Sequence, residues 1–421
     1  MWRGLLARDL RLARSAAEGE ARWCSYPSCG QECPRSRAGA TDRASGPTSW
    51  DRSRHWLAAR ATCAPRGPVP EKDPHPSPAK PRRRSRMVGR SGVATAGNWI
   101  VDRIKTIDQW PEQDTLALVL AESRAGGGGA YNVLVDLAQM GVEYPLFAIG
   151  CVGDDGDGRY IAEDLAPRGI DTRWLQTIAG TPTSYTEVMA VAETGRRTFF
   201  HHYGANAAFG PEHLPFDQLP ARVLHLAYLL LLRRLDEVGA DGVSVGARVL
   251  QDAATVGLRT SLDLVSAQPE RARAVVRPAL PFVDQLVINE LEAGALTGRR
   301  LESLGALRDA ARELLEAGVR QRVIIHLAQG GYGATADGAE HWQPSLRLPD
   351  GFVVGAVGAG DAFAAGCVHA LHEGWDLERS LRTAVATATA CLRHPTTTGG
   401  VGLLADNQAL LEAHPPLTGW A

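Results

Sequence analysis

The decapeptide Val357–Gly366 combines a glycine-rich turn with one acidic side chain. It reads Val-Gly-Ala-Gly-Asp-Ala-Phe-Ala-Ala-Gly, and the small apolar residues after Asp361 are typical of a closely packed helix. A turn of this kind before a helix presents backbone N–H groups that attract phosphate. Asp361 then has two possible roles: it caps the helix, or it accepts a proton from a hydroxyl that attacks a bound phosphoryl group.

A second glycine run, Gly126–Gly129, leads into a predicted helix that ends at Gly141. Four consecutive glycines are either a flexible linker or a place where the backbone approaches a ligand closely. At a helix start the second interpretation is favoured. Asn132, just inside the helix, offers both a donor and an acceptor to a hydroxyl-rich molecule.

Two further groups of polar residues follow predicted strands. Asp102 ends the apolar run 93–102, which we expect to be the opening core strand, and side chains at strand carboxyl ends line the ligand crevice of an open α/β sheet. Asn289 and Glu292 also follow a strand, where amide and carboxylate oxygens suit a hydrated magnesium ion. The alternatives are an ordinary turn aspartate and a helix cap. The aspartates of residues 154–157 lack EF-hand spacing, so we interpret residues 152–158 as a loop.

The elements that must position these residues alternate between strands and helices. We predict strands at 146–150, 222–227, 260–265, 285–288 and 323–327, and helices at 306–317 and 377–392. This alternation is typical of a doubly wound α/β domain. Strands at 115–120 and 184–192, with a hairpin into 198–201, interrupt the pattern and predict a small β-sheet that serves as a lid.

Residues 1–92 differ in composition from the rest of the chain. Residues 1–90 carry 19 lysines and arginines against 8 acidic residues, a net charge of +11, whereas the remaining residues carry 26 against 39, a net charge of −13. Ten of the 25 prolines also precede residue 91. This composition predicts a disordered, basic, Pro- and Arg-rich tail.

Functional interpretations of the tail are weak. Cys24, Cys29 and Cys33 lack the paired spacing and the fourth ligand of a zinc site, and acidic residues argue against an organelle-targeting peptide. The basic run 82–86 is a possible nucleic-acid arm, but the acidic body opposes that partner. Our preferred hypothesis is that Met87 is the true start and that residues 1–86 are mistranslated upstream sequence, which mass spectrometry of the natively expressed protein would test.

Hydropathy and cysteine usage predict a cytoplasmic protein. No apolar run reaches the roughly 18 residues that a membrane span needs. Cys151, Cys367 and Cys391 lie far apart among apolar neighbours. That pattern suits buried thiols in a reducing compartment.

Taken together, these motifs resemble the ribokinase-like, or PfkB, carbohydrate kinase family over roughly residues 93–406. The resemblance depends on the order and spacing of six motifs, each of which would be weak alone. They are Gly97 with Asp102, Gly127–Asn132, Val152–Asp155, Arg197-Thr198 with Gly204–Asn206, Asn289 with Glu292, and Gly358–Asp361.

The resemblance implies a fold and a reaction. The fold would be a Rossmann-like α/β/α sandwich, the ribokinase fold, over residues 93–421, with lid strands within about 103–125 and 183–203. The reaction would move the γ-phosphate of ATP to a hydroxyl of a sugar or sugar-like substrate. The resemblance also implies that the reaction requires magnesium and that the protein forms a dimer through the lid.

The resemblance also implies residue roles. Asp361 would be the catalytic base, with Gly358, Ala359 and Gly360 forming the anion hole. Sugar hydroxyls would bind to Asp102, Gly127, Gly128 and Asn132. The nucleotide would lie near Asn289, Glu292, Gly331 and Gly333, with magnesium held by Glu292 through water and by Asp263.

Three departures leave alternatives open. Gly355-Ala356 replace the usual Asp-Thr, so a monovalent-cation site is not assured. His326-Leu327-Ala328 replace the usual Thr-x-Gly, and Asp263-Leu264-Val265 replace Asp-x-Asn. A nucleoside kinase of the same fold and a non-catalytic relative that binds a ligand or a partner protein therefore stay as alternatives.

Overall fold

The computed structural model describes residues 89–420, and its centre is a sheet of nine strands. The strand order is β13-β12-β11-β10-β9-β8-β1-β4-β5, and all neighbours are parallel except the pairs that β12 forms with β11 and β13. The strands are β1 (Val93–Gly97), β4 (Leu146–Gly153), β5 (Ile170–Ile178), β8 (Val223–Leu229), β9 (Arg259–Leu264), β10 (Gln285–Asn289), β11 (Arg322–Leu327), β12 (Gly330–Thr335) and β13 (Glu340–Pro344).

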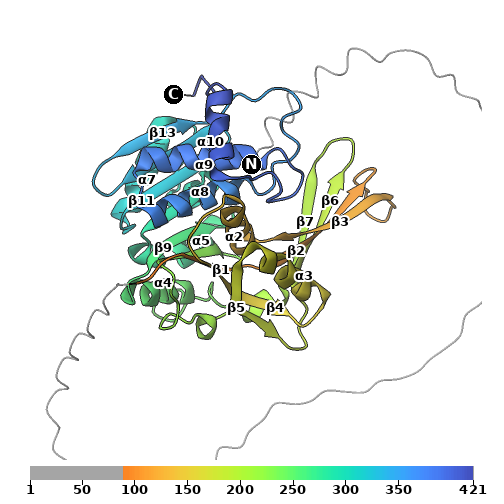
Figure 1. The fold of residues 1–421 in the computed structure, drawn as a ribbon, viewed down its shortest axis with the longest axis horizontal. Helices are drawn as coiled ribbons and strands as arrows, with labels where there is room; N and C mark the ends of the chain where they lie inside the picture. Colours follow the sequence, from red (N-terminus) through yellow and green to blue (C-terminus); the bar gives the residue numbers. More distant parts are fainter. Residues whose placement is uncertain (1–88, 421) are drawn as a thin grey trace, which may run out of the picture. The chain divides into compact units, whose positions relative to one another are not determined.

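Helices cover both faces of this sheet (Figure 1). They are α2 (Gly129–Gln139), α3 (Gly156–Leu165), α4 (Val245–Thr255), α5 (Pro269–Val276), α6 (Glu290–Thr297), α7 (Leu304–Glu316), α8 (Ala359–Glu373), α9 (Leu377–Cys391) and α10 (Leu404–Ala413). Because successive strand residues point to opposite faces, Leu224 and Val223 of β8 belong to different buried clusters. The molecule thus has an α/β/α sandwich with two cores.

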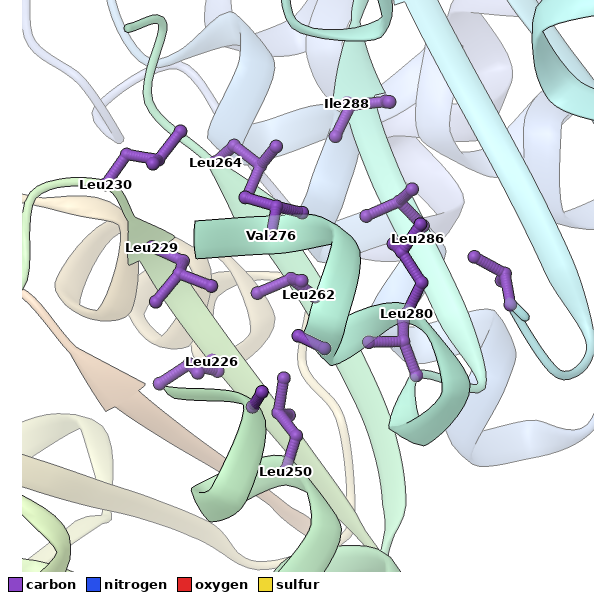
Figure 2. Packing of buried hydrophobic residues seen from close by; sticks show 14 of the residues in the cluster. Leu226, Leu229, Leu230, Leu250, Leu262, Leu264, Val276, Leu280, Leu286 and Ile288 are labelled. Atoms are coloured by element: carbon purple, nitrogen blue, oxygen red, sulfur yellow. The ribbon is translucent and has the colours of Figure 1, made fainter. Parts of the chain in front are cut away.

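One core lies between β8, β9 and β10 and the helices α4 and α5 (Figure 2). Leu226 and Leu262 project from adjacent strands toward Leu250 of α4, and all three are fully buried. Burying a leucine side chain contributes roughly 1.5–3 kcal/mol. This packing fixes the central strands, and their carboxyl ends carry several of the polar groups described below.

A second sheet of four strands forms the lid, in the order β3-β2-β6-β7. Its strands are β2 (Ile100–Ile107), β3 (Val119–Gly127), β6 (Ser184–Val191) and β7 (Arg197–His202). In Figure 1 these strands stand away from the main sheet. The lid predicted from the sequence is therefore present, although its strand β2 was not expected and β3 continues to Gly127, beyond the expected range 115–120.

The chain changes direction across the sheet next to β1. From β1 the order runs to β4 and β5 on one side, and the chain then returns to β8 and proceeds through β9, β10 and β11 on the other. Such a switch point leaves a crevice at the carboxyl ends of the neighbouring strands. Those ends are Gly97 of β1 and the last residues of β8.

The run from Val93 to Asp102 was expected to be one core strand, and this prediction is wrong. Gly97 adopts φ 140°, and a Cβ there would lie 1.6 Å from the carbonyl oxygen of Ala227. Only glycine allows this close approach, so the chain leaves the main sheet at Gly97. Asp102 consequently lies inside the lid strand β2 and not at the end of a core strand.

Two other local predictions were wrong in their bounds. Residues 115–118 are not part of a strand, because Asp114 has φ 66° and the Thr115 N–H donates to Glu112 in a turn. Residues 152–158 are not one loop, because β4 continues to Gly153 and Asp155 caps α3 by accepting from Gly158 N–H at 2.9 Å. The other predicted strands and helices are present with ends shifted by a few residues.

The predictions about the tail of residues 1–92 concern residues outside the described part of the chain, apart from its last four. Within residues 89–420 no helix is long and apolar enough to cross a membrane. The three cysteines of this part are buried and unpaired, as predicted.

Candidate active site

The start of α8 carries the turn that the sequence singled out. Gly358 has φ 86°, and a Cβ there would lie 2.0 Å from the carbonyl oxygen of Thr397. The first bond of the helix runs from the Ala362 N–H to the Gly358 carbonyl at 2.8 Å. The N–H groups of Ala359, Gly360 and Asp361 precede it in the first turn, where helix geometry provides no intrahelical acceptor. Such groups can hold an anion.

Asp361 is almost completely buried, and side chains from two other elements hold its carboxylate. Asn132 of α2 donates from Nδ2 to Oδ2 at 2.8 Å, and the hydroxyl of Tyr228 donates to Oδ1 at 2.5 Å. Burial, followed by the nearby charge of Asp263, raises the pKa of Asp361 to about 6. A carboxyl group with such a pKa is ionised at neutral pH and is a stronger proton acceptor than an exposed aspartate.

The second glycine run is divided between two elements. Gly126 and Gly127 end β3, Gly128 caps α2 with φ 88°, and Gly129 begins the helix. A Cβ on Gly127 would lie 2.5 Å from Asp102 Oδ2, so the lid carboxylate lies directly against this backbone. The run is therefore not a flexible linker but a point of close approach between the lid, α2 and Asp102.

Asp102 lies on the face of the lid that is turned toward α8. It lines a narrow pocket with Arg197 and Phe199 of the lid and with Val357 and Thr397 of the main domain. Burial, followed by the negative charge of Asp361, raises the pKa of Asp102 to about 7. The structure thus brings Asp102 close to the turn that precedes Asp361.

Asp263 lies on β9 beside a buried histidine of β8. Its Oδ2 is 3.4 Å from Nε2 of His225, whose Nδ1 lies 3.1 Å from the hydroxyl of Ser261. Asp263 Oδ1 is buried and has no hydrogen-bond partner. Burial raises the pKa of Asp263. A buried carboxylate oxygen without a partner is costly, so it is a position where a water or a hydrated cation would bind.

Asn289 and Glu292 form a capping box at the start of α6. The Asn289 side chain accepts from the N–H groups of Leu291 and Glu292, and Glu292 accepts in return from Asn289 N–H at 3.0 Å. Ser266 also donates to Glu292. Burial raises the pKa of Glu292 to about 8. The helix-cap interpretation is thus observed, and it leaves a buried carboxyl near Asp263, whose charge also raises this pKa.

Magnesium fits this donor set. The ion prefers oxygen ligands and usually keeps several waters, binding one or two carboxylates together with substrate phosphates. Across residues 89–420 no group of three or more histidine, cysteine or acidic side chains is arranged to hold a metal. Magnesium needs only one or two protein carboxylates, and the unpartnered Asp263 oxygen and the buried Glu292 carboxyl match this need.

Gly331 and Gly333 lie in β12, where helices pack closely. A Cβ on Gly331 would lie 2.7 Å from the Phe363 ring of α8, and one on Gly333 would lie 2.6 Å from Leu377 of α9. These contacts give both glycines a packing role. His326 of β11 packs against Phe363 with ring centroids 5.0 Å apart and the rings tilted by 34°, and burial lowers the pKa of His326 to about 4. The imidazole beside the α8 start is therefore neutral.

Sequence reasoning missed Tyr228 and His225. Both lie in β8, inside an apolar run that contained no recognisable motif. Their places became visible only when β8 was set between β1 and β9. The one available signal was a polar aromatic residue at the carboxyl end of a predicted core strand, the position where ligand-contacting groups gather.

A buried carboxylate under a lid, beside the free N–H groups of a helix start, has the geometry of a phosphotransferase that uses a general base. The sequence comparison agrees, since residues 92–401 match the pfkB family of carbohydrate kinases. The chain belongs to this family and is a carbohydrate kinase.

Several curated proteins are similar to the chain. It is 26% identical over 323 residues to a ribokinase of Arabidopsis thaliana, covering 76% of this chain and 80% of that protein. It is 30% identical over 298 residues to an ATP-dependent ribose-1-phosphate kinase of Halopiger xanaduensis, covering 70% and 89%. It is 27% identical over 306 residues to an aminoimidazole riboside kinase of Salmonella typhimurium, covering 70% and 86%.

Solved structures share the fold. Arabidopsis thaliana ribokinase complexed with ribose and ATP has a TM-score of 0.64 and 22% identity, covering 77% of this chain and 99% of that chain. A protein of E. coli described as ribokinase II, in complex with ATP and Mg²⁺, has a TM-score of 0.63 and 21% identity, covering 77% and 100%. The ribokinase fold expected from the sequence is confirmed.

Proposed function

We propose that this protein transfers the γ-phosphate of ATP to a hydroxyl of a ribose-like sugar, with Asp361 as the general base. The observation that carries the proposal is the position of Asp361. Its buried carboxylate lies in the first turn of α8, beside the N–H groups that suit a phosphoryl group, and within the electrostatic reach of Asp102 under the lid. One short segment thus supplies both the charge stabilisation and the proton acceptor that phosphoryl transfer needs.

The reaction follows from these groups. The substrate hydroxyl loses its proton to the Asp361 carboxylate as its oxygen forms a bond to the γ-phosphorus. The bond from that phosphorus to the bridging oxygen breaks, and ADP leaves with the electron pair. N–H groups of residues 358–361 would stabilise the charge on the equatorial oxygens of the migrating group.

The acceptor sugar would bind between the lid and α2. Asp102, the backbone at Gly127 and Gly128, and Asn132 surround this position, and carboxylate and amide groups match sugar hydroxyls. Asn132 already donates to Asp361 at 2.8 Å. We therefore assign to Asn132 the orientation of the base as well as contact with the sugar.

The nucleotide would lie along the carboxyl ends of β9, β10 and β11, near Gly331 and Gly333. Asp263 and Glu292 would hold a magnesium ion, Glu292 through water, and this ion supplies charge neutralisation to the phosphates. The relatives described as ATP-dependent or as bound to ATP and Mg²⁺ support this assignment.

A nucleoside substrate is the second candidate. The similarity to an aminoimidazole riboside kinase favours it, because that name describes an acceptor with a ribose and an attached base. The exposed ring of Phe199 in the lid pocket offers a surface on which a base can stack.

Two properties of the whole protein belong to the same proposal. We infer a cytoplasmic location from the three buried unpaired thiols and the ATP requirement. We also infer a homodimer through the outer face of the lid, where Trp110 stacks on the exposed Phe200 with centroids 6.3 Å apart. Such an exposed aromatic pair is a natural contact surface.

The decisive experiment measures ADP release with ribose, deoxyribose, ribose 1-phosphate, fructose and a set of nucleosides. We expect turnover with at least one ribose-containing acceptor, and Asp361→Asn should lower kcat by roughly 10²–10⁴-fold because the proton acceptor is lost. Nucleotide affinity of this variant should change little, which isothermal titration with ADP would check. Unchanged kcat in Asp361→Asn would remove this residue from the role of base, and inactivity toward every acceptor would favour the non-catalytic alternative.

A further inference from the structure

The segment after β8 holds Tyr228 in a strained but well-supported turn. The Tyr228 carbonyl accepts from Leu231 N–H at 3.0 Å, and Leu230 between them has φ 86°. A non-glycine residue in this left-handed region is uncommon and strained. The buried carboxylate of Asp236 accepts from the N–H groups of Leu230 and Leu232 at 2.8 and 3.2 Å, which keeps the turn in place.

The Tyr228 ring is also fixed by the start of α2. A Cβ on Gly129 would lie 2.7 Å from the Tyr228 ring, so the ring occupies the space that a side chain at Gly129 would fill. The side chain is partly exposed, and its hydroxyl donates to Asp361 Oδ1 at 2.5 Å. The strained turn at Leu230 and the close packing at Gly129 thus both hold the Tyr228 hydroxyl against Asp361.

The two hydrogen-bond partners of Asp361 differ in chemistry. The Nδ2 group of Asn132, which faces Oδ2, can only donate. A phenol can donate or accept. When Asp361 takes up a proton, a hydrogen on Oδ2 would face the N–H donor of Asn132, whereas a hydrogen on Oδ1 could be accepted by the Tyr228 oxygen.

We propose that Tyr228 is a positioning residue for the phosphoryl transfer: it donates to Asp361 Oδ1 before the reaction and accepts from the Oδ1–H group after it. The inference rests on the proposed role of Asp361. In the step, the substrate O–H bond breaks and its proton binds Oδ1. The phenol then turns its own hydrogen toward the crevice, and no oxidant, reductant or further reactant is needed.

The groups that act on the Asp361 carboxylate come from every neighbouring element. Asp263 raises the pKa of Asp361, whereas the hydrogen bonds from Tyr228 and Asn132 and the proximity of His225 lower it. Asp136 of α2, Asp102 of the lid and Cys391 of α9 also lie within its electrostatic reach. The Tyr228 phenol itself keeps its proton, because burial and the Asp361 charge raise the pKa of Tyr228 well above its usual value.

The test compares Tyr228→Phe with Tyr332→Phe. Tyr332 is the control because its ring packs in the buried cluster that does not include the α8 residues beside Asp361. Carbon-13 labelling of aspartate side chains allows the Asp361 pKa to be followed by NMR in the substrate-free protein, with Asp361→Asn giving the assignment. Kinetics then give the pH profile of kcat for whichever acceptor the wild type uses.

For Tyr228→Phe we expect the Asp361 pKa and the acid limb of kcat to move upward by about one pH unit, since one hydrogen bond to the anion is lost. At optimal pH kcat should fall by roughly 10-fold or more, because the proton has lost its acceptor on Oδ1. Tyr332→Phe should match the wild type in both measurements. An unchanged pKa together with kcat within about 2-fold of wild type would overturn the proposal.

A second substitution keeps the proposal testable if Tyr228→Phe does not fold. Fluorotyrosine at position 228 preserves the ring and makes the hydroxyl a stronger donor, so the Asp361 pKa should move downward, and no movement would count against the proposal. The NMR titration also distinguishes the proposed role of Tyr228 from the proposed kinase activity. A wild type that phosphorylates no acceptor but whose Asp361 pKa responds to Tyr228 would refute the proposed function and leave the hydrogen bond established.

Discussion

The Asp361 carboxylate combines burial with two hydrogen-bond donors, and this combination predicts the pH dependence of the reaction. Burial and Asp263 raise its pKa to about 6. Because the base must be ionised, kcat should fall about tenfold per unit as the pH drops below 6 and should level off above 7. The measurement is kcat against pH at saturating magnesium and ATP. The residual activity of Asp361→Asn should not show this fall in kcat at low pH. A fall that persists in the variant would have another origin.

At the same scale, the sequence predicted some site residues and missed others for a physical reason. Asp361 and Asn132 follow glycine turns, and such turns have recognisable local sequences. Tyr228 and His225 act through neighbours on other elements, at 2.5 Å from Asp361 of α8 and 3.4 Å from Asp263 of β9. Contacts across strands depend on sheet order, which a single sequence does not contain.

At the scale of the element, α8 must begin at one fixed place, and Gly358 enforces it. For Gly358→Ala we expect a loss of about 2 kcal/mol or more in unfolding free energy, because the left-handed φ and the clash with the Thr397 carbonyl add. Chemical denaturation measures this loss. kcat should fall as well, since the helix start would move.

Gly374→Ala is the matched control for that substitution. Gly374 ends the same helix with φ 72°, and a Cβ there would meet nothing within 4 Å. It should cost only about 1 kcal/mol, the penalty of the left-handed backbone, and leave kcat unchanged. Equal stability and activity in the two variants would show that the contact with Thr397 does not matter.

The elements also differ in how well the sequence predicted them. Helix α7 has apolar residues on one face and charged residues on the other, and it was predicted within two residues at each end. The lid strand β2 was missed, because residues 93–102 read as one apolar run and the break at Gly97 depends on contact with Ala227 of β8. Long-range contacts, not local propensity, determine this break.

At the scale of the whole molecule, the outer face of the lid predicts self-association. Phe200→Glu should convert a dimer into monomers by placing a charge in an apolar contact, and sedimentation velocity would show the change. Leu403→Glu is the matched control, since Leu403 is similarly exposed at 57% but lies at the start of α10. A wild type that sediments as a monomer, or a Phe200→Glu protein that still dimerises, would contradict the prediction.

The alternation of strands and helices sufficed to predict the doubly wound fold, because each helix between parallel strands has its own apolar face. It did not predict that β12 runs antiparallel to β11 and β13, since a hairpin at Ala328 and Gln329 replaces a crossover helix there. The strand order determines the switch point beside β1 and therefore the location of the crevice.

Asn206 connects the two segments by which the chain enters the lid. Its side-chain amide donates to the Trp99 carbonyl and to the Asn98 side chain and accepts from the Trp99 N–H, where the chain enters β2. Its backbone N–H donates to the hydroxyl of Ser184 at the start of β6. Hydrogen bonds from Asn206 therefore hold the starts of both β2 and β6. Asn206→Ala should let the lid melt as a separate cooperative unit, so that calorimetry records two transitions in the variant where the intact protein gives one. A single transition in the variant would mean that the sheets are joined more broadly than by this amide.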